Sequence, residues 1–229
     1  MVDTMKRRLE LSEISEVLNT IDWRDLECVR SHSYSLLRRI ADSRETLGRL
    51  LASAIASAHL RNMFEHYDIL DKLVLFDHRE TGARLRLHVF LPGYFDRPHD
   101  HRWKYTTLIL RGGYRHVTYL PKDYSSANSI RDMRPSIISD EREGHSYTYD
   151  AHMFHSITAE ASTVTLVLRG PSEKEKFLVV DRASGNAWWQ YGAAAESEHQ
   201  RSAKSMTDEQ LEATLNLLSE KRVALVERM

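Results

Sequence analysis

The sequence is poor in cysteine and in long apolar runs, and both shortages exclude classes of protein. Cys28 is the only cysteine among 229 residues, so neither an internal disulfide nor a cysteine-based metal site can form. No apolar run is long enough to cross a bilayer. The first residues, MVDTMKRRLELSEISEVL, lack the basic patch and apolar stretch of a secretory signal. We therefore expect a soluble protein in the reducing cytoplasm.

An excess of charge of one sign is also missing. The chain has 32 lysines and arginines against 33 acidic residues, a formal net charge of −1. A nucleic acid or an anionic membrane as partner would require a basic bias, and the composition has none. With 41% hydrophobic residues the chain can still bury a core. The expected partner is a small molecule, with no nucleic acid and no membrane.

Helices are predicted at both ends of the chain. Apolar residues recur at helical spacing over residues 9–18 and 24–40, and the DSRE sequence at residues 42–45 resembles a capping box that starts a third helix over residues 44–65. Thr207 is the expected N-cap of a last helix. These helices are expected to pack on the outside of the domain between them, and their apolar stripes also suit a homodimer.

Between the helices the hydrophobic period changes to that of strands. Short runs rich in β-branched and aromatic residues alternate with turn signals: KLVLFDH, RLRLHVFL, TTLILRGGYRHVTYL, SYTYDAHMFHSI, STVTLVLRG, KFLVVDR and AWWQYG. They predict an antiparallel barrel or sandwich. The polar stretch 121–143 is expected to be a long surface loop, with a lid near the site as one role. The chain thus divides into a helical segment (1–70), a β-barrel (71–192) and a connector with a C-terminal helix (193–229).

The stretch that indicates chemistry is GYFDRPHDHRWKYTTLILRGGYRH, with His99 and His101 at its centre. Residues i and i+2 of a strand share a face, so both imidazoles can reach one metal ion. Downstream, His152 and His155 can each offer a third imidazole where a turn leads into a new strand. The alternative is a set of hydrogen-bonded histidines without a metal.

These residues resemble the two motifs of the cupin superfamily. The matching positions are, in chain order, Pro98, His99, His101, Gly113, Gly144 and His155. The resemblance implies a mainly β fold, the double-stranded β-helix or jelly-roll barrel, which the terminal helices make α+β overall, with a metal held inside the barrel. It favours His155 over His152 as the third ligand. Thr106 stands where many cupins have a glutamate ligand, so the implied site has three histidines.

A narrower resemblance, over residues 72–171, is to the thiol dioxygenases of the cysteine dioxygenase type. The shared features are the helices before the barrel, the HDH tripeptide at residues 99–101, the LRG turn at residues 110–112 and the strand TVTLVLRGP. The Ser-x-His-x-Tyr strand of that family is replaced here by TLVLR, and its carboxylate-binding arginine cannot be placed. The resemblance therefore implies Fe(II) and O2 chemistry without implying cysteine as the substrate.

Three imidazoles leave coordination positions for substrate and O2, which suits Fe(II), and they also suit Zn, Ni, Mn or Cu in non-redox work. The resemblance favours Fe(II). A 2-oxoglutarate oxygenase would need a carboxylate where His101 stands, and Asp100 alternates to the other strand face. We therefore expect a metal-dependent cupin enzyme, a non-haem iron oxidoreductase of the dioxygenase kind that oxidises a small polar metal-chelating substrate with O2. The alternatives are a non-redox decarboxylase, isomerase or lyase, and a non-catalytic cupin that binds a small ligand.

Aromatic residues and one further histidine are candidates for the chemistry beside the metal. Tyr105 and Tyr149 could donate hydrogen bonds to a substrate, with ordinary packing as the alternative. His152 is a candidate catalytic group or replacement ligand. Trp103 is a candidate wall of the substrate pocket.

Arginines are candidates for binding the substrate. Arg169 shares a strand face with Thr165 and could anchor an anion, whereas pairing with an acidic residue at the rim is the alternative. Arg86 shares a face with Arg84 and His88. That row would bind an anion if it pointed into the barrel, but charged residues on a strand normally face solvent, which is the favoured interpretation.

Overall fold

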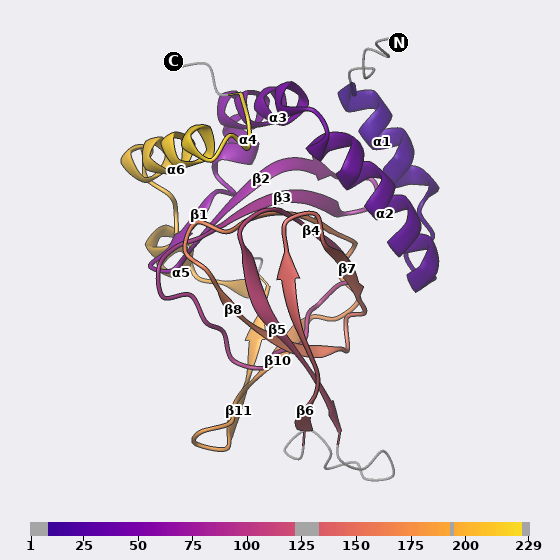
Figure 1. The fold of residues 1–229 in the computed structure, drawn as a ribbon, viewed down its shortest axis with the longest axis vertical. Coiled ribbons are helices and arrows are strands. Elements are labelled where there is room, and N and C mark those ends of the chain that lie inside the picture. The colour runs from indigo at the N-terminus through magenta and orange to yellow at the C-terminus, as the bar shows by residue number, and fades with distance from the viewer. Residues whose placement is uncertain (1–8, 122–132, 193–194, 226–229) are drawn as a thin grey trace.

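The computed structural model describes residues 9–121, 133–192 and 195–225, which form a β-barrel with helices laid over one side (Figure 1). The helices are α1 (Leu11–Thr20), α2 (Leu26–Ala41), α3 (Arg44–Ala56), α4 (Ala58–Arg61), α5 (Glu198–Ala203) and α6 (Asp208–Glu220). The strands are β1 (Glu65–Tyr67), β2 (Leu70–His78), β3 (Ala83–Phe90), β4 (Tyr105–Arg111), β5 (Gly113–Pro121), β6 (Met133–Arg142), β7 (Ser146–Tyr149), β8 (Phe154–Ala159), β9 (Val164–Arg169), β10 (Lys176–Asp181) and β11 (Asn186–Tyr191). The predicted class, mainly β with helices at both ends, is confirmed.

The strand order is that of a jelly roll. One sheet runs β1-β2-β3-β9-β4-β7, and the sheet that faces it runs β6-β5-β8. Residues 94–99 extend the second sheet past β8, through the antiparallel bridges Phe95–Thr158 and His99–His155. An order that crosses back between two antiparallel sheets in this way is a pair of Greek keys. The hairpin of β10 and β11 lies against the same residues, because the Val180 N–H donates to the Pro98 carbonyl over 2.8 Å.

The predicted helices are present, but the third one is shorter than expected. The helix predicted over residues 44–65 ends at Ala56, because Ser57 adopts an extended conformation and caps the separate short helix α4 by accepting from the Leu60 N–H. The chain is already in strand β1 at Glu65. At the other end of the chain, Thr207 caps α6 as predicted, because its hydroxyl oxygen accepts from the Gln210 N–H. The Gln210 side chain in turn accepts from the Thr207 N–H, which completes a capping box.

The prediction of an irregular loop over residues 121–143 is wrong for its second half. Residues 133–142 form strand β6, which pairs along β5. Its side chains are mostly exposed, so the strand lacks the apolar alternation by which a half-buried strand is recognised. A lid formed by the first half of this stretch would fall on residues 122–132, which lie outside the described residues.

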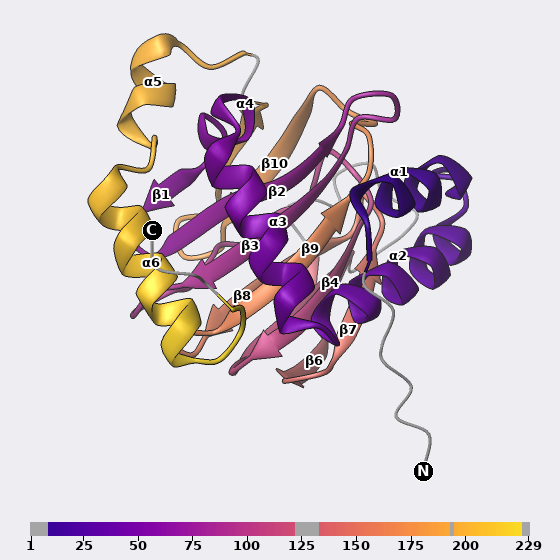
Figure 2. The ribbon, with the colours of Figure 1, turned by 90° about the horizontal axis from the view of Figure 1, so that it is seen from above.

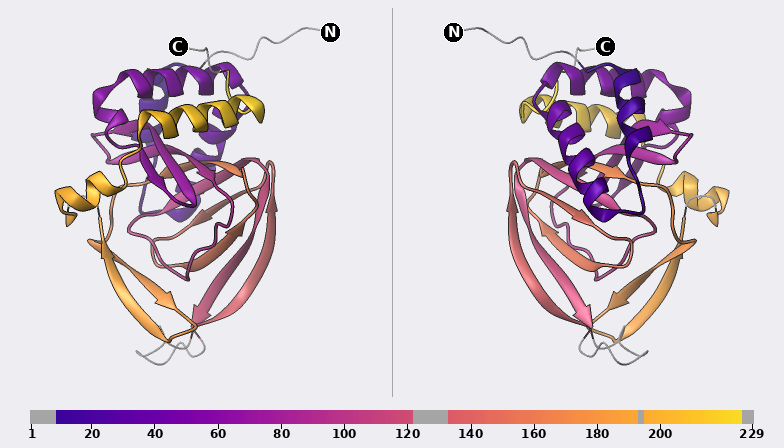
Figure 3. Two further views of the ribbon diagram at one scale, coloured as in Figure 1. Left: turned by 90° about the vertical axis from the view of Figure 1, so that its left-hand side faces the viewer. Right: turned by 90° about the vertical axis from the view of Figure 1, so that its right-hand side faces the viewer.

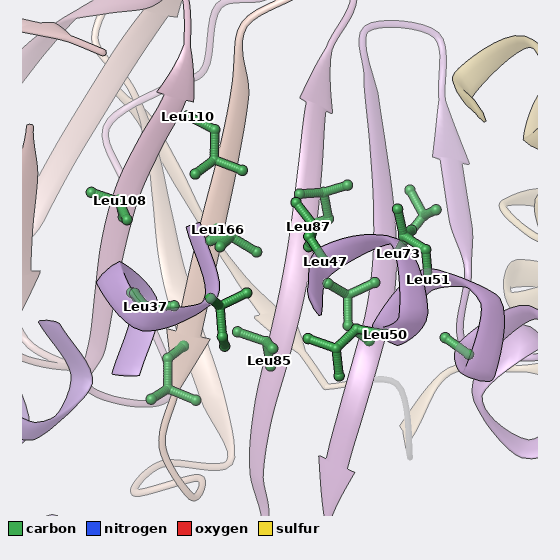
Figure 4. Packing of buried hydrophobic residues seen from close by; sticks show 14 of the residues in the cluster. Leu37, Leu47, Leu50, Leu51, Leu73, Leu85, Leu87, Leu108, Leu110 and Leu166 are labelled. Carbon is green, nitrogen blue, oxygen red and sulfur yellow. The ribbon is translucent and has the colours of Figure 1, made fainter. Parts of the chain in front are cut away.

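The helices cover the outer face of the larger sheet. Seen from above, α3 crosses β2 and β3, and α2 lies over the same face of the sheet by β4 and β7, with α1 beside it (Figure 2). The side views show the opposite sheet bare of helices (Figure 3). Leucines of both layers interdigitate there (Figure 4), among them Leu37, Leu47 and Leu51 of the helices and Leu73, Leu85, Leu87, Leu108 and Leu166 of the strands. Within the described residues, no helix is long and apolar enough to span a membrane.

This helical layer determines which strand face points into the barrel. Along β3, Leu85 and Leu87 belong to the core under the helices, whereas Arg86 and His88 line the cavity on the other side. The same holds along β9, where Leu166 lies under the helices. Since successive side chains of a strand alternate between faces, the apolar set is on the outside of the barrel and the polar set is on the inside.

Candidate metal centre

Two of the predicted ligands are held together by the backbone of the second sheet. His99 lies at the end of residues 94–99 and His155 lies in β8. The His99 N–H donates to the His155 carbonyl over 3.0 Å, and the His155 N–H donates to the His99 carbonyl over 3.0 Å. This pair brings the two imidazoles side by side, with ring centroids 4.7 Å apart. His101 follows two residues later and brings its ring centroid to 5.0 Å from that of His155.

The three imidazoles converge on one point. One ring nitrogen of each of His99, His101 and His155 lies within 4.8 Å of the other two, and the Nε2 atoms of His101 and His155 are 2.7 Å apart. Nδ1 of His99 lies 2.8 Å from the Arg97 carbonyl oxygen, which can only accept. That nitrogen therefore carries the proton, and Nε2 of His99 is left with a free lone pair.

A fourth histidine, His116 of β5, orients the third ligand. Its Nε2 lies 2.9 Å from Nδ1 of His155, and its Nδ1 faces Oε1 of Glu141 at 3.8 Å. With a proton on Nδ1 of His155, this chain of groups directs the lone pair of Nε2 toward the other two histidines. Sequence reasoning missed His116. The signal that was present is its place in β5, on the same strand face as the buried Tyr114 and Thr118.

The donor set fits a divalent metal. Burial, reinforced by the neighbouring His99, lowers the pKa of His101 and of His155 well below the usual value, so both rings are neutral at pH 7, the form that binds a metal. Asp100 is used elsewhere: its Oδ1 accepts the Leu178 N–H over 2.7 Å and its Oδ2 accepts from Lys174. Three imidazole nitrogens are donors shared by Fe(II), Zn, Ni, Mn and Cu.

The histidines open onto a cavity of about 630 Å³ inside the barrel. Its walls come from the inner faces of β2, β3, β4 and β9, so the polar residues of β3 face this space rather than bulk water. The solvent-facing interpretation of Arg84, Arg86 and His88 is therefore wrong. It failed because the helices, which cover the apolar face of β3, turn its charged face inward. Arg84 is neutralised there by Asp77, over 2.6 Å from its Nε.

Of the candidate catalytic residues, one lines the cavity and two do not. The Tyr105 hydroxyl lies 3.1 Å from Nε2 of His155 and lines the cavity. Tyr149 is hydrogen-bonded to Thr118 and stacks on His116, so it packs behind the ligands. His152 is exposed on the turn before β8 and is not among the residues that line the cavity. The structure does not bring His152 to the other candidate residues, and its role as a catalytic group or replacement ligand stays a prediction.

The predicted substrate-binding residues all line the cavity. Arg169 makes no ion pair within the described residues: its Nη1 donates to the carbonyls of Gly82 and Gly170, 2.8 Å each, so the alternative of an acidic partner at the rim does not hold. Thr165 is buried with its hydroxyl unpaired. Trp103 forms part of the wall, its ring centroid 4.9 Å from the Arg169 guanidinium carbon.

Comparisons with known proteins add little. No protein-family model matches the chain, and no curated protein matches it. Among solved structures, KdgF from Halomonas sp. is 13% identical, with 47% of this chain and 86% of that one covered and a TM-score of 0.36. An RmlC-like cupin from Shewanella frigidimarina is 15% identical, with 48% and 85% covered and a TM-score of 0.36. The DMSP lyase DddQ from Ruegeria pomeroyi is 11% identical, with 48% and 51% covered and a TM-score of 0.36. Likenesses this weak carry nothing about activity or ligand.

Proposed function

We propose that this chain is a metal-dependent enzyme of the cupin type and, more narrowly, a non-haem Fe(II) oxygenase that oxidises a small, polar, metal-chelating molecule with O2. The observation that supports it most is the convergence of three imidazole nitrogens on the wall of an internal cavity, without a carboxylate among them. Three protein ligands leave positions for a chelating substrate and for O2. Zn, Ni, Mn and Cu are the alternative metals for the same donor set.

When bound, Fe(II) would supply O2 activation and a Lewis-acid centre. His99, His101 and His155 would hold it, and His116 would keep the ring of His155 in the ligating orientation. Burial raises the pKa of Tyr105 well above the usual value, so its hydroxyl stays protonated at neutral pH. Placed 3.1 Å from Nε2 of His155, that hydroxyl is positioned to donate a hydrogen bond to an oxygen atom of the substrate.

A second candidate, a non-redox lyase or isomerase, is favoured by a partly buried carboxyl group in the same cavity. Asp96 lines it and is held in place because its Oδ1 accepts the Ile157 N–H and its Oδ2 accepts from the Tyr94 hydroxyl, over 2.6 and 3.0 Å. Burial raises the pKa of Asp96, which brings it closer to the range of a general base or acid at neutral pH. Sequence reasoning did not select this residue.

Oxygen uptake separates the two candidates. The protein is loaded with Fe(II) under anaerobic conditions and mixed with air-saturated buffer and a panel of thiols, amino acids and small acids, with the Zn(II)-loaded protein as control. An oxygenase consumes O2 in proportion to product with Fe(II) alone. Turnover without O2 consumption, or equal turnover with Zn(II), contradicts the oxygenase and supports the second candidate. Binding without any turnover contradicts both and supports a ligand-binding cupin.

A further inference from the structure

Three arginines surround the ring of Trp103 at one end of the cavity. The guanidinium carbons of Arg169, Arg86 and Arg102 lie 4.9, 5.5 and 5.6 Å from the centroid of that ring. The three come from different segments, β9, β3 and the residues before β4, which the barrel brings together. We call Arg86, Arg102 and Arg169 the arginine cluster. The face of one indole ring holds the three guanidinium groups near one another, and the N–H groups of Arg86 make no hydrogen bond within the described residues.

No carboxylate within the described residues forms an ion pair with the arginine cluster. Arg102 donates to the Lys174 carbonyl and to the Ser172 hydroxyl, over 3.1 and 2.8 Å. The Nε atoms of Arg86 and Arg169 are buried and have no hydrogen-bond partner in the part of the chain that the structure describes. Burial, with the positive charges of Arg86 and Arg84, lowers the pKa of Arg169 to about 8, which reflects how poorly its charge is compensated.

Two other cations that line the cavity form ion pairs with carboxylates. Arg84 is paired with Asp77 over 2.6 Å, and Lys204 is paired with both Glu65 and Glu196 over 2.7 Å. Buried charges in proteins are normally paired in this way. The arginine cluster has no such pair, and of the other cations in the wall only Lys72, whose Nζ lies over the Tyr67 ring, also lacks one within the described residues. The partner that the cluster lacks is an anion that no described residue provides.

The arginine cluster adjoins the histidines. Trp103 lies two residues after His101, and their ring centroids are 6.3 Å apart. All of these side chains line the same cavity. A small molecule whose one end meets the histidines can therefore place a second group among the guanidinium groups.

We propose that the arginine cluster is a subsite for an oxyanion, a phosphate or carboxylate group, carried by the substrate at the end remote from the metal. The planar fork of arginine matches both groups in a bidentate manner. Several converging guanidinium groups favour a doubly charged oxyanion over a single carboxylate. The position of the metal end rests on the proposed function; the anion subsite itself does not.

The test is calorimetric titration of the metal-free full-length chain with inorganic phosphate and, separately, with malonate and acetate, at constant ionic strength set with chloride. Saturable binding of phosphate or malonate is expected. Phosphate binding more tightly than malonate indicates a phosphorylated substrate, and the reverse order indicates a dicarboxylate. Acetate is expected to bind more weakly than either.

Arg86→Met is the decisive variant, because Arg86 makes no hydrogen bond to any described residue that its loss would break. Loss of one charge-assisted interaction is expected to weaken anion binding about 10- to 100-fold, with part of the affinity restored by Arg86→Lys. Arg115→Met, at an exposed position of β5, is the matched control and should bind as the unchanged chain does. Arg102→Met provides a second variant if Arg86→Met is unstable.

The inference is overturned if neither phosphate nor malonate binds, or if Arg86→Met and Arg102→Met bind them as tightly as Arg115→Met does. Because the titration uses metal-free protein, its outcome does not depend on metal binding. Anion binding that persists in His101→Ala, combined with no metal binding by the unchanged chain, would support the subsite and contradict the proposed function. Metal binding by the unchanged chain without anion binding would contradict the subsite and leave the proposed function supported.

Discussion

His99 and His155 exchange both of their backbone hydrogen bonds, each of 3.0 Å, so one pair of backbone contacts sets the spacing of two imidazoles that converge with His101. Residues 94–99 and β8 are joined here by the sheet itself rather than by side chains. The ligating geometry is therefore part of the fold, and a metal can bind without reorganising the backbone.

Removing His116 should weaken metal binding without removing a ligand. His116→Leu leaves Nδ1 of His155 without its partner at 2.9 Å, so the ring loses the contact that orients it. Loss of such an outer contact typically lowers metal affinity about 10- to 100-fold, which competition with a coloured chelator measures. His145→Leu is the control, since His145 also faces Glu141 but is exposed. Equal affinity of the two variants would contradict this role of His116.

The helical layer should contribute much of the stability. Leu87→Ala removes a fully buried side chain between β3 and the helices, which should lower the free energy of unfolding by about 2 to 5 kcal/mol. Urea denaturation followed by circular dichroism measures this change. Leu11→Ala, on the exposed side of α1, should cost less than about 0.5 kcal/mol. A similar small effect of both variants would mean that the layer is not closely packed.

Gly112 should resist substitution more than another glycine of the same backbone conformation. Its φ is +72°, and a Cβ atom there would lie 2.6 Å from Oγ1 and 3.0 Å from Cα of Thr163. Gly93 has a φ of +85°, and a Cβ atom added to it would have no neighbour within 4 Å. Gly112→Ala combines strain and a clash, whereas Gly93→Ala has strain alone, of about 1 kcal/mol. The melting temperature of Gly112→Ala should be clearly the lower of the two, and equal values would contradict the steric argument.

Lowering the pH should remove the contribution that Asp77 makes to the free energy of unfolding. Burial alone would raise the pKa of this carboxyl, but hydrogen bonds from His59 and Arg84 outweigh it and hold the pKa below the usual value. A lowered folded-state pKa adds stability that is present above the unfolded pKa of about 3.9 and is lost as the pH falls through the folded value. Asp77→Asn should therefore be less stable than the unchanged chain at pH 7, by about 1 to 3 kcal/mol.

Below about pH 4 that difference in unfolding free energy should shrink, because the unchanged chain protonates Asp77 while the asparagine cannot titrate. Urea denaturation of both proteins at pH 7, 5 and 3.5 measures it. A difference that stays constant down to pH 3.5 would show that the pKa of Asp77 is not lowered in the folded state.

The strands and terminal helices could be predicted because their apolar residues follow a period of two or of 3.6. Which face of each strand lines the barrel interior could not be predicted. The row of Arg84, Arg86 and His88 was predicted to face solvent, since a single sequence does not reveal which face a helical layer covers. The same gap explains why His116 and Asp96 were missed: each lines up with the site only through pairing of distant strands. Ser57 divides the predicted third helix because its side chain caps α4, and the spacing of apolar residues gives no sign of such a cap.

The measurement that tests the metal centre most directly is metal content per chain after anaerobic loading with Fe(II) and removal of unbound metal. The unchanged chain should retain about one ion, and His99→Ala, His101→Ala and His155→Ala should each retain close to none while staying folded. His152→Ala, an exposed histidine three residues from His155, should retain as much as the unchanged chain. Full metal content in all three ligand variants, or its loss in His152→Ala, would contradict the account.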